Sequence, residues 1–189
     1  MRLFLAINFP PEVRDRLFQA TAVMREAEPR IRWVTSPLLH VTLKFLGEQP
    51  QEMVPPLMQR VRSAVAGVGA IRASISGVGT FPNFRRPRIV WIGVQGDDRL
   101  SRVVERVEGA CVDSGLAAEE RPFRAHITLG RVRDELRGAD AARLEEVART
   151  VRAREETVIG TVDLMESTLS PAGSRYRVVA TAPLGRGTT

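Results

Sequence analysis

The chain has 189 residues with a formal net charge of +6, and 43% of its residues are hydrophobic. This composition excludes an intrinsically disordered chain, and the positive charge favours an anionic partner such as a nucleic acid. No apolar run approaches the roughly 20 residues of a membrane helix, and the leading LFLAI is shorter than the roughly 7–15 residues of a signal-peptide core. A single cysteine, Cys111, excludes an internal disulfide. We therefore expect a cytoplasmic protein of one large domain without membrane contact.

Apolar runs and helical spacings predict the same succession of elements twice along the chain. RLFLAIN at 2–8 indicates a buried strand, and Pro11 suits the first turn of a helix predicted over 12–27. A strand beginning with His40 and a helix with apolar residues over 57–65 complete the first succession. The second succession has strands at 88–94 and from His126, and helices over 98–112 and 144–151. Further strands are predicted at 71–79, 157–169 and 174–182.

The two successions superpose at an offset of 86 residues, which also superposes the two histidines of the chain, His40 and His126. At this offset RLFLAIN falls without a gap on RIVWIGV at 88–94. Such repetition predicts an α+β fold of two similar sheet-and-helix lobes, related by a pseudo-twofold axis with the active-site cleft between them. We take 1–189 as a single bilobal domain with repeat halves of about 1–86 and 87–189, and we expect the lobes to exchange strands.

Each histidine opens the same pattern, His-Val/Ile-Thr-Leu. Because side chains alternate along a strand, His40 and Thr42 share one face, as do His126 and Thr128. Lys44 continues the alternation from His40, and Arg131 follows the second motif closely enough to reach the cleft. A repeated core position would more naturally be apolar, so the two histidines favour a functional site over a structural role.

Two imidazoles facing each other suit a reaction that removes one proton and delivers another. An unperturbed pKa near 6.5 lets histidine act as a base when neutral and as an acid when charged. Displacement at phosphorus, with the attacking and leaving oxygens in line, needs these groups on opposite sides. The threonine hydroxyls and nearby cations would then bind the phosphate oxygens.

The strings RLFLAIN, HVTLKFLGE, RPRIVWIGV and AHITLGR, with one H-x-T-L motif in each half, resemble the 2H phosphoesterases. They look most like the bacterial RNA 2′,3′-cyclic phosphodiesterase branch, also called 2′-5′ RNA ligases. The resemblance spans essentially the whole chain. It implies a bilobal fold and cofactor-free, metal-independent opening of a 2′,3′-cyclic phosphate to a 2′-phosphate. Reversible 2′-5′ RNA ligation is a further activity of that family.

The resemblance also implies roles for individual residues. The histidines of the family fall on His40, which would protonate the leaving 3′-oxygen, and on His126, which would activate water. Its threonines fall on Thr42 and Thr128, and its arginine after the second motif on Arg131. The sequence itself does not distinguish the acid from the base, because the two motifs are near-copies.

Other residues are candidates for binding RNA, each with a structural alternative. Four aromatic residues could stack a base or could pack in the core or in loops: Trp33, Phe45, Phe81 and Phe84. Arg85, Arg86 and Arg88 could bind phosphates or form a solvated basic loop. The expected partner is RNA with a 2′,3′-cyclic phosphate end, or a cyclic nucleotide, bound by a monomer.

Two other classes of protein remain as alternatives. An RNA-end-binding protein without turnover would keep the cleft, although a pure binder has no need of paired proton carriers. A two-histidine metal hydrolase would need about three or more protein ligands. Neither histidine motif contains a carboxylate, so we expect no metal.

Overall fold

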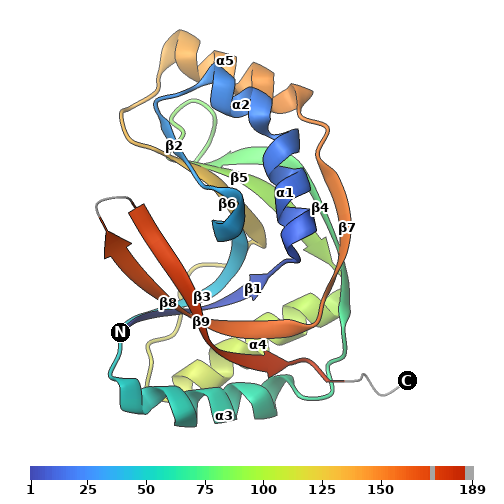
Figure 1. Ribbon diagram of the computed structural model, residues 1–189, viewed down its shortest axis with the longest axis vertical. Coiled ribbons are helices and arrows are strands. Elements are labelled where there is room, and N and C mark those ends of the chain that lie inside the picture. The colour runs from blue at the N-terminus through green and yellow to red at the C-terminus, as the bar shows by residue number, and fades with distance from the viewer. Residues whose placement is uncertain (171–172, 186–189) are drawn as a thin grey trace.

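The computed structural model describes residues 1–170 and 173–185, and one curled sheet runs through all of this part of the chain (Figure 1). The strands run in the order β7-β4-β5-β6-β3-β1-β8-β9, with β2 paired to β6. Their bounds are β1 Arg2–Asn8, β2 Ile31–Trp33, β3 His40–Glu48, β4 Ile71–Phe81, β5 Ile89–Gly96, β6 His126–Val132, β7 Arg154–Ile159, β8 Thr161–Ser170 and β9 Gly173–Pro183.

The sheet has two halves that meet where β3 and β6 lie side by side through the pair Val41 and Ile127. We call β3, β1, β8 and β9 the first lobe, and β6, β5, β4, β7 and β2 the second lobe. β8 lies beside β1 although it is far away in the sequence, and β4 pairs with β5 and β7 in the second lobe. Each lobe therefore contains strands from both halves of the chain, and the expected α+β bilobal fold is confirmed.

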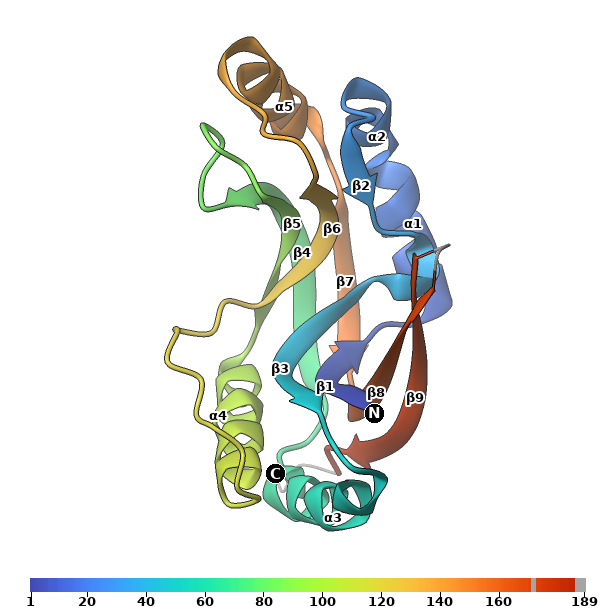
Figure 2. The same cartoon turned by 90° about the vertical axis from the view of Figure 1, so that its left-hand side faces the viewer.

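Helices cover one face of this sheet. α2 (Ala22–Ala27) and α5 (Gly138–Thr150) lie together at one end of the molecule, and α3 (Val54–Val65) and α4 (Asp98–Val112) at the other (Figure 2). α1 (Pro11–Ala20) begins with Pro11, whose fixed φ suits a first helical turn. α4 begins where the Asp97 carboxylate accepts a hydrogen bond from the Arg99 backbone N–H at 3.0 Å. In the described part of the chain, no helix is long and apolar enough to cross a membrane.

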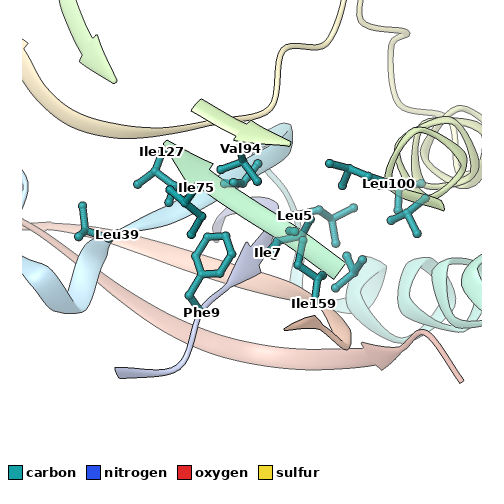
Figure 3. Close-up of a cluster of buried hydrophobic side chains, with 14 of the residues drawn as sticks. Leu5, Ile7, Phe9, Leu39, Ile75, Val94, Leu100, Ile127 and Ile159 are labelled. Carbon is teal, nitrogen blue, oxygen red and sulfur yellow. The ribbon is translucent and has the colours of Figure 1, made fainter. Parts of the chain in front are cut away.

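The hydrophobic core lies between the helices and this face of the sheet, and it draws residues from both lobes (Figure 3). Leu5, Ile75 and Ile127 are fully buried and alternate along their strands with residues of the opposite face. Truncation of Ile127 to alanine would cost about 2–5 kcal/mol. Cys111 of α4 belongs to this core as expected, and burial raises the pKa of its thiol to about 11. The opposite face of the sheet is left for the functional site.

Three sequence predictions differ from the structure. The helix predicted over 12–27 is two helices, because the chain breaks at buried Thr21, whose hydroxyl donates to the Leu17 carbonyl at 2.9 Å. The strand predicted over 157–169 is two strands separated at Gly160, β7 in the second lobe and β8 in the first. The three-residue strand β2 was not predicted.

The superposition of the first strands of the two halves was wrong by one residue. Ala6 lies opposite Thr42 in the first lobe, whereas Trp91 lies opposite Thr128 in the second. The equivalent of Ala6 is therefore Trp91, an offset of 85 and not 86. Because a shift of one residue moves every side chain to the other face, this correction decides which residues of β1 and β5 lie beside the histidines.

Candidate active site

The two histidine strands carry the same irregularity at the same place. Along β3, Lys44 lies opposite Leu5 and Thr42 opposite Ala6, so Leu43 is an extra residue. Along β6, Gly130 lies opposite Val90 and Thr128 opposite Trp91, so Leu129 is an extra residue. Each of these β-bulges interrupts the alternation of side chains. As a result Phe45, and not Lys44, lies on the face of His40 and Thr42, and Arg131 lies on the face of His126 and Thr128.

Lys44 is therefore not where the alternation placed it. Its side chain is turned to the helix-covered face and is 5% exposed. The ammonium group lies 2.6 and 2.7 Å from the two carboxylate oxygens of Glu108 and 2.7 Å from the Ala117 carbonyl oxygen. These three bonds use all of its protons. The structure corrects the assignment of Lys44 to the cleft, because a bulge precedes it.

Both imidazoles are held in the same way. The Nδ1 atom of His40 lies 2.7 Å from the Leu38 carbonyl oxygen, and that of His126 lies 2.6 Å from the Arg124 carbonyl oxygen. A carbonyl oxygen only accepts, so Nδ1 carries a proton in each ring and Nε2 is the atom that exchanges protons. The Nε2 atom of His40 lies 3.1 Å from the Thr42 hydroxyl, which joins the first histidine-threonine pair directly.

Aromatic rings fix the orientation of each imidazole. Tyr176 packs edge-on against His40 at a centroid distance of 5.3 Å, and Phe4 lies at 5.1 Å. Phe81, one of the candidates from the sequence, packs edge-on against His126 at 5.0 Å. Trp91 lies beside both Phe81 and His126, at 5.2 and 6.4 Å.

Sequence reasoning missed Phe4, Tyr176 and Trp91. For Phe4 and Trp91, the available signal was the position opposite a histidine strand, but this signal depends on the register that the sequence superposition had wrong by one residue. For Tyr176, the pairing of β9 with β8 brings the ring to His40, and the local sequence does not predict that pairing.

The other candidate residues lie in different surroundings. Phe45 is 66% exposed and contacts Phe4 at a centroid distance of 6.0 Å, so its ring lies at the open edge of the His40 side. Trp33 donates its indole N–H to the Glu28 carbonyl oxygen at 3.0 Å. Both Trp33 and Phe84 pack against the core. Arg85 and Arg86 are exposed in the loop before β5, where their backbone N–H groups donate to the Asn83 side chain. Arg88 is also exposed in this loop.

The electrostatics connect the two lobes. The pKa of the His40 imidazole is lowered, first by burial and then by the positive charges of Arg131 and His126, while the Leu38 carbonyl acts in the opposite direction. Arg131 and His126 belong to β6, and His40 belongs to β3. Because β3 and β6 also pair in the sheet, the two histidines lie on adjacent strands, close enough for their charges to interact. Within the described ranges, no group of three or more His, Cys, Asp or Glu residues could hold a metal ion.

The fold and the site together define a class of protein in which two tandem repeats each supply one histidine strand to a shared site. The chain belongs to the family described as LigT like Phosphoesterase, whose model matches residues 7–91 and again residues 92–176. The resemblance to the 2H phosphoesterases is therefore confirmed.

Relatives and solved structures agree with this family. An RNA 2′,3′-cyclic phosphodiesterase of Thermus thermophilus is 34% identical over 188 residues, which cover 95% of this chain and 88% of that protein. Another of that name, from Methanothermobacter thermautotrophicus, is 30% identical over 176 residues, covering 93% and 95%. The crystal structure of TT0787 of Thermus thermophilus superposes with a TM-score of 0.80 at 27% identity over all of both chains. The apo structure of E. coli LigT, at 23% identity, shares the fold, with a TM-score of 0.75 over 98% and 97% of the chains.

Proposed function

We propose that the protein hydrolyses the 2′,3′-cyclic phosphate at RNA ends to a 2′-phosphate by acid and base catalysis from His40 and His126. The observation that carries this proposal is the paired geometry of the histidines. Each is on an equivalent bulged strand, and each is held through Nδ1 so that Nε2 exchanges protons. The relatives named RNA 2′,3′-cyclic phosphodiesterase supply the substrate class.

In the proposed reaction, Nε2 of His126 removes a proton from water as the water oxygen attacks phosphorus. The bond from phosphorus to the 3′-oxygen breaks on the opposite side, and Nε2 of His40 protonates that oxygen. The 2′-oxygen keeps the phosphate, which gives a 2′-phosphomonoester and a free 3′-hydroxyl. Proton transfer by each positioned group contributes on the order of 10²–10⁴-fold in rate.

The surrounding residues bind the phosphate. Thr42 and Thr128 share the faces of the histidines, and their hydroxyls donate to the non-bridging oxygens. Arg131 lies on the same face as His126, and its guanidinium neutralises the charge that develops during attack. Burial lowers the pKa of His40 in the free enzyme, and the charge of Arg131 lowers it further. A bound anionic phosphate acts in the opposite direction and favours the imidazolium form that the acid role requires.

Phe81 packs against His126, and Phe45 packs against Phe4, which in turn packs against His40. We therefore assign base stacking to Phe45 and Phe81 and not to Trp33 or Phe84, which pack against the core. The proposal includes a monomer that acts in the cytoplasm without a metal or cofactor. Reversible 2′-5′ ligation would use the same two histidines in the opposite direction. An RNA-end-binding protein without turnover is the alternative, and paired Nε2 atoms are the observation that disfavours it.

The experiment uses an oligonucleotide ending in a 2′,3′-cyclic phosphate, incubated with the protein after prolonged treatment with a chelator. We expect hydrolysis to a 2′-phosphate, identified by phosphorus NMR of the product. His40→Ala and His126→Ala should each lose on the order of 10²–10⁴-fold in rate, and the double variant should lose far less than the product of the two losses. Activity that disappears with the chelator and returns with zinc or manganese would contradict metal independence. A single variant with near-full activity would contradict the two-histidine mechanism.

A further inference from the structure

A row of residues crosses the second lobe from His126 to the edge strand β7. His126 on β6 lies opposite Gly93 on β5, Gly93 lies opposite Ser76 on β4, and Ser76 lies opposite Arg154 on β7. Residues paired in this way point to the same face of the sheet. Arg154 is therefore on the face of His126, at three strand spacings or roughly 14 Å.

The outer part of this row is a groove of about 470 Å³. It is lined by Ser74, Ser76, Gly77, Gln95, Val151, Arg152, Ala153 and Arg154. Gly93 and Gly77 have no side chains, and a Cβ atom at Gly93 would meet the Ser76 carbonyl oxygen at 3.0 Å. The Trp91 ring lies 3.7 Å from the same point. The row from His126 thus has no side chain of its own at Gly93, and the groove beyond it offers hydroxyl, amide and guanidinium donors, which suit phosphate and sugar oxygens.

The first lobe does not repeat this groove. The residue opposite His40 is Asn8, whose amide donates to the Asp163 carboxylate at 2.8 Å. Asp163 is 7% exposed and also accepts a hydrogen bond from the Thr181 hydroxyl at 2.7 Å. Side chains and a carboxylate therefore occupy the region that is open and basic in the second lobe. Between these two described regions, a polyanion that leaves the histidines therefore meets hydrogen-bond donors and positive charge over the second lobe and a buried carboxylate over the first.

We infer that this groove binds the backbone phosphate of a nucleotide upstream of the cyclic end, so that the RNA chain runs from the histidines across β5 and β4 toward Arg152 and Arg154. The inference rests on the proposed function, which supplies the RNA substrate. One acidic group, Glu156, lies 3.8 Å from the Arg154 guanidinium. Both side chains are largely exposed, so this ion pair is weak and a phosphate can replace it.

The test compares two substrates in the double variant Arg152→Ala/Arg154→Ala. One is a short single-stranded RNA ending in a 2′,3′-cyclic phosphate, and the other is a 2′,3′-cyclic mononucleotide, which ends before the groove. We expect the ratio of their kcat/KM values to fall roughly tenfold through a higher KM for the RNA, the effect of one lost charged hydrogen-bonded contact. The dependence of RNA binding on salt should become shallower by about 0.7 in log–log slope for each lost phosphate contact.

The control variant is Arg102→Ala, which removes one positive charge, against two in the double variant, from an exposed position on α4 outside the groove. An unchanged ratio, or an equal change in Arg102→Ala, would overturn the inference. Fluorescence anisotropy with the same RNA ending in a 2′-phosphate separates the inference from the proposed function, because it needs no turnover. If wild-type protein hydrolyses neither substrate, the proposed function fails, while weaker binding of this RNA to the double variant still supports the groove and equal binding overturns it.

Discussion

Replacing Lys44 by methionine distinguishes an anchoring role from the substrate-binding role that strand alternation predicts. Methionine keeps most of the buried stem and removes the ammonium group. In the structure this deletes the ion pair with Glu108 and the hydrogen bond to the Ala117 carbonyl oxygen. The Glu108 carboxylate keeps its hydrogen bond from the Glu119 backbone N–H at 2.8 Å. The loop before β6 therefore loses its bond to Lys44 and keeps its bond to Glu108.

The expected loss of stability follows from how deeply the two partners are buried. Breaking a fully buried pair costs about 3–5 kcal/mol, and an exposed pair contributes about 0–1 kcal/mol. The Lys44 side chain is 5% exposed but that of Glu108 is 31% exposed, and water therefore solvates the remaining carboxylate. We expect a loss of about 2 kcal/mol, which for a chain of this length lowers Tm by about 4–8 °C.

The assay combines thermal unfolding with kcat/KM on a 2′,3′-cyclic mononucleotide well below Tm. An anchoring role predicts the loss of stability and a kcat/KM within roughly threefold of wild type. Glu108→Gln should also destabilise the protein, and the double variant should lose less than the sum of the single losses, since the two residues interact directly. A Lys44→Met protein with wild-type stability and a kcat/KM reduced more than tenfold would refute this reasoning and return Lys44 to the substrate.

The remaining predictions concern the proposed chemistry. A substrate whose 3′-leaving oxygen is replaced by sulfur needs little protonation of the leaving group. On this substrate the activity of His40→Ala should be largely restored and that of His126→Ala should not, as measured by the rate of thiol release. Restored activity of His126→Ala would reverse the two roles. Burial and the charges of Arg131 and His126 lower the pKa of the His40 imidazole. If His40 is the acid, the decline of kcat/KM on the alkaline side (its alkaline limb) should therefore begin below about pH 6.5. A bound phosphate should move the corresponding decline of kcat to higher pH. These limbs belong to the coupled pair of histidines, and a kcat/KM still rising above neutral pH would contradict the assignment. Arg131→Lys keeps the charge but not the bidentate fork, so its kcat/KM should remain impaired. Arg131→Ala should also move the alkaline limb of kcat/KM to higher pH. A lysine variant equal to wild type would leave Arg131 only a general electrostatic role.

The repeat in the sequence was sufficient to predict the lobes and the pairing of histidine with threonine. It worked because both copies keep the same apolar periodicity and because His40 and His126 are the two histidines of the chain. The repeat could not show which residue of β1 is equivalent to which residue of β5. The runs LFLAI at 3–7 and IVWIGV at 89–94 are apolar throughout, and a slip of one residue leaves such a run apolar on both faces.

The bulges were equally hidden, and they decide the composition of the site. The extra residues, Leu43 and Leu129, are apolar and stand where strict alternation from the histidines expects an inward side chain, so the pattern of hydrophobic residues carries no sign of the bulges. Strict alternation therefore placed Lys44 on the wrong face. The aromatic candidates were equally hard to separate, because only sheet pairing shows that Trp33 lies opposite Gly130 and packs against the core.

The symmetry of the scaffold and the asymmetry of its side chains have different consequences for the proposed reaction. The repeated bulge gives both lobes a histidine, a threonine and one further side chain on the same face, which provides two proton carriers of matched geometry. Two residues beyond each bulge, however, the first lobe has the exposed ring of Phe45 and the second has the guanidinium of Arg131. Opposite the histidines, Asn8 bonded to Asp163 in the first lobe contrasts with Gly93 in the second. A symmetric site alone would accept the cyclic phosphate in two orientations. These differences place the positive charge, and a neighbouring position without a side chain, on the His126 side, and so favour one orientation of the RNA.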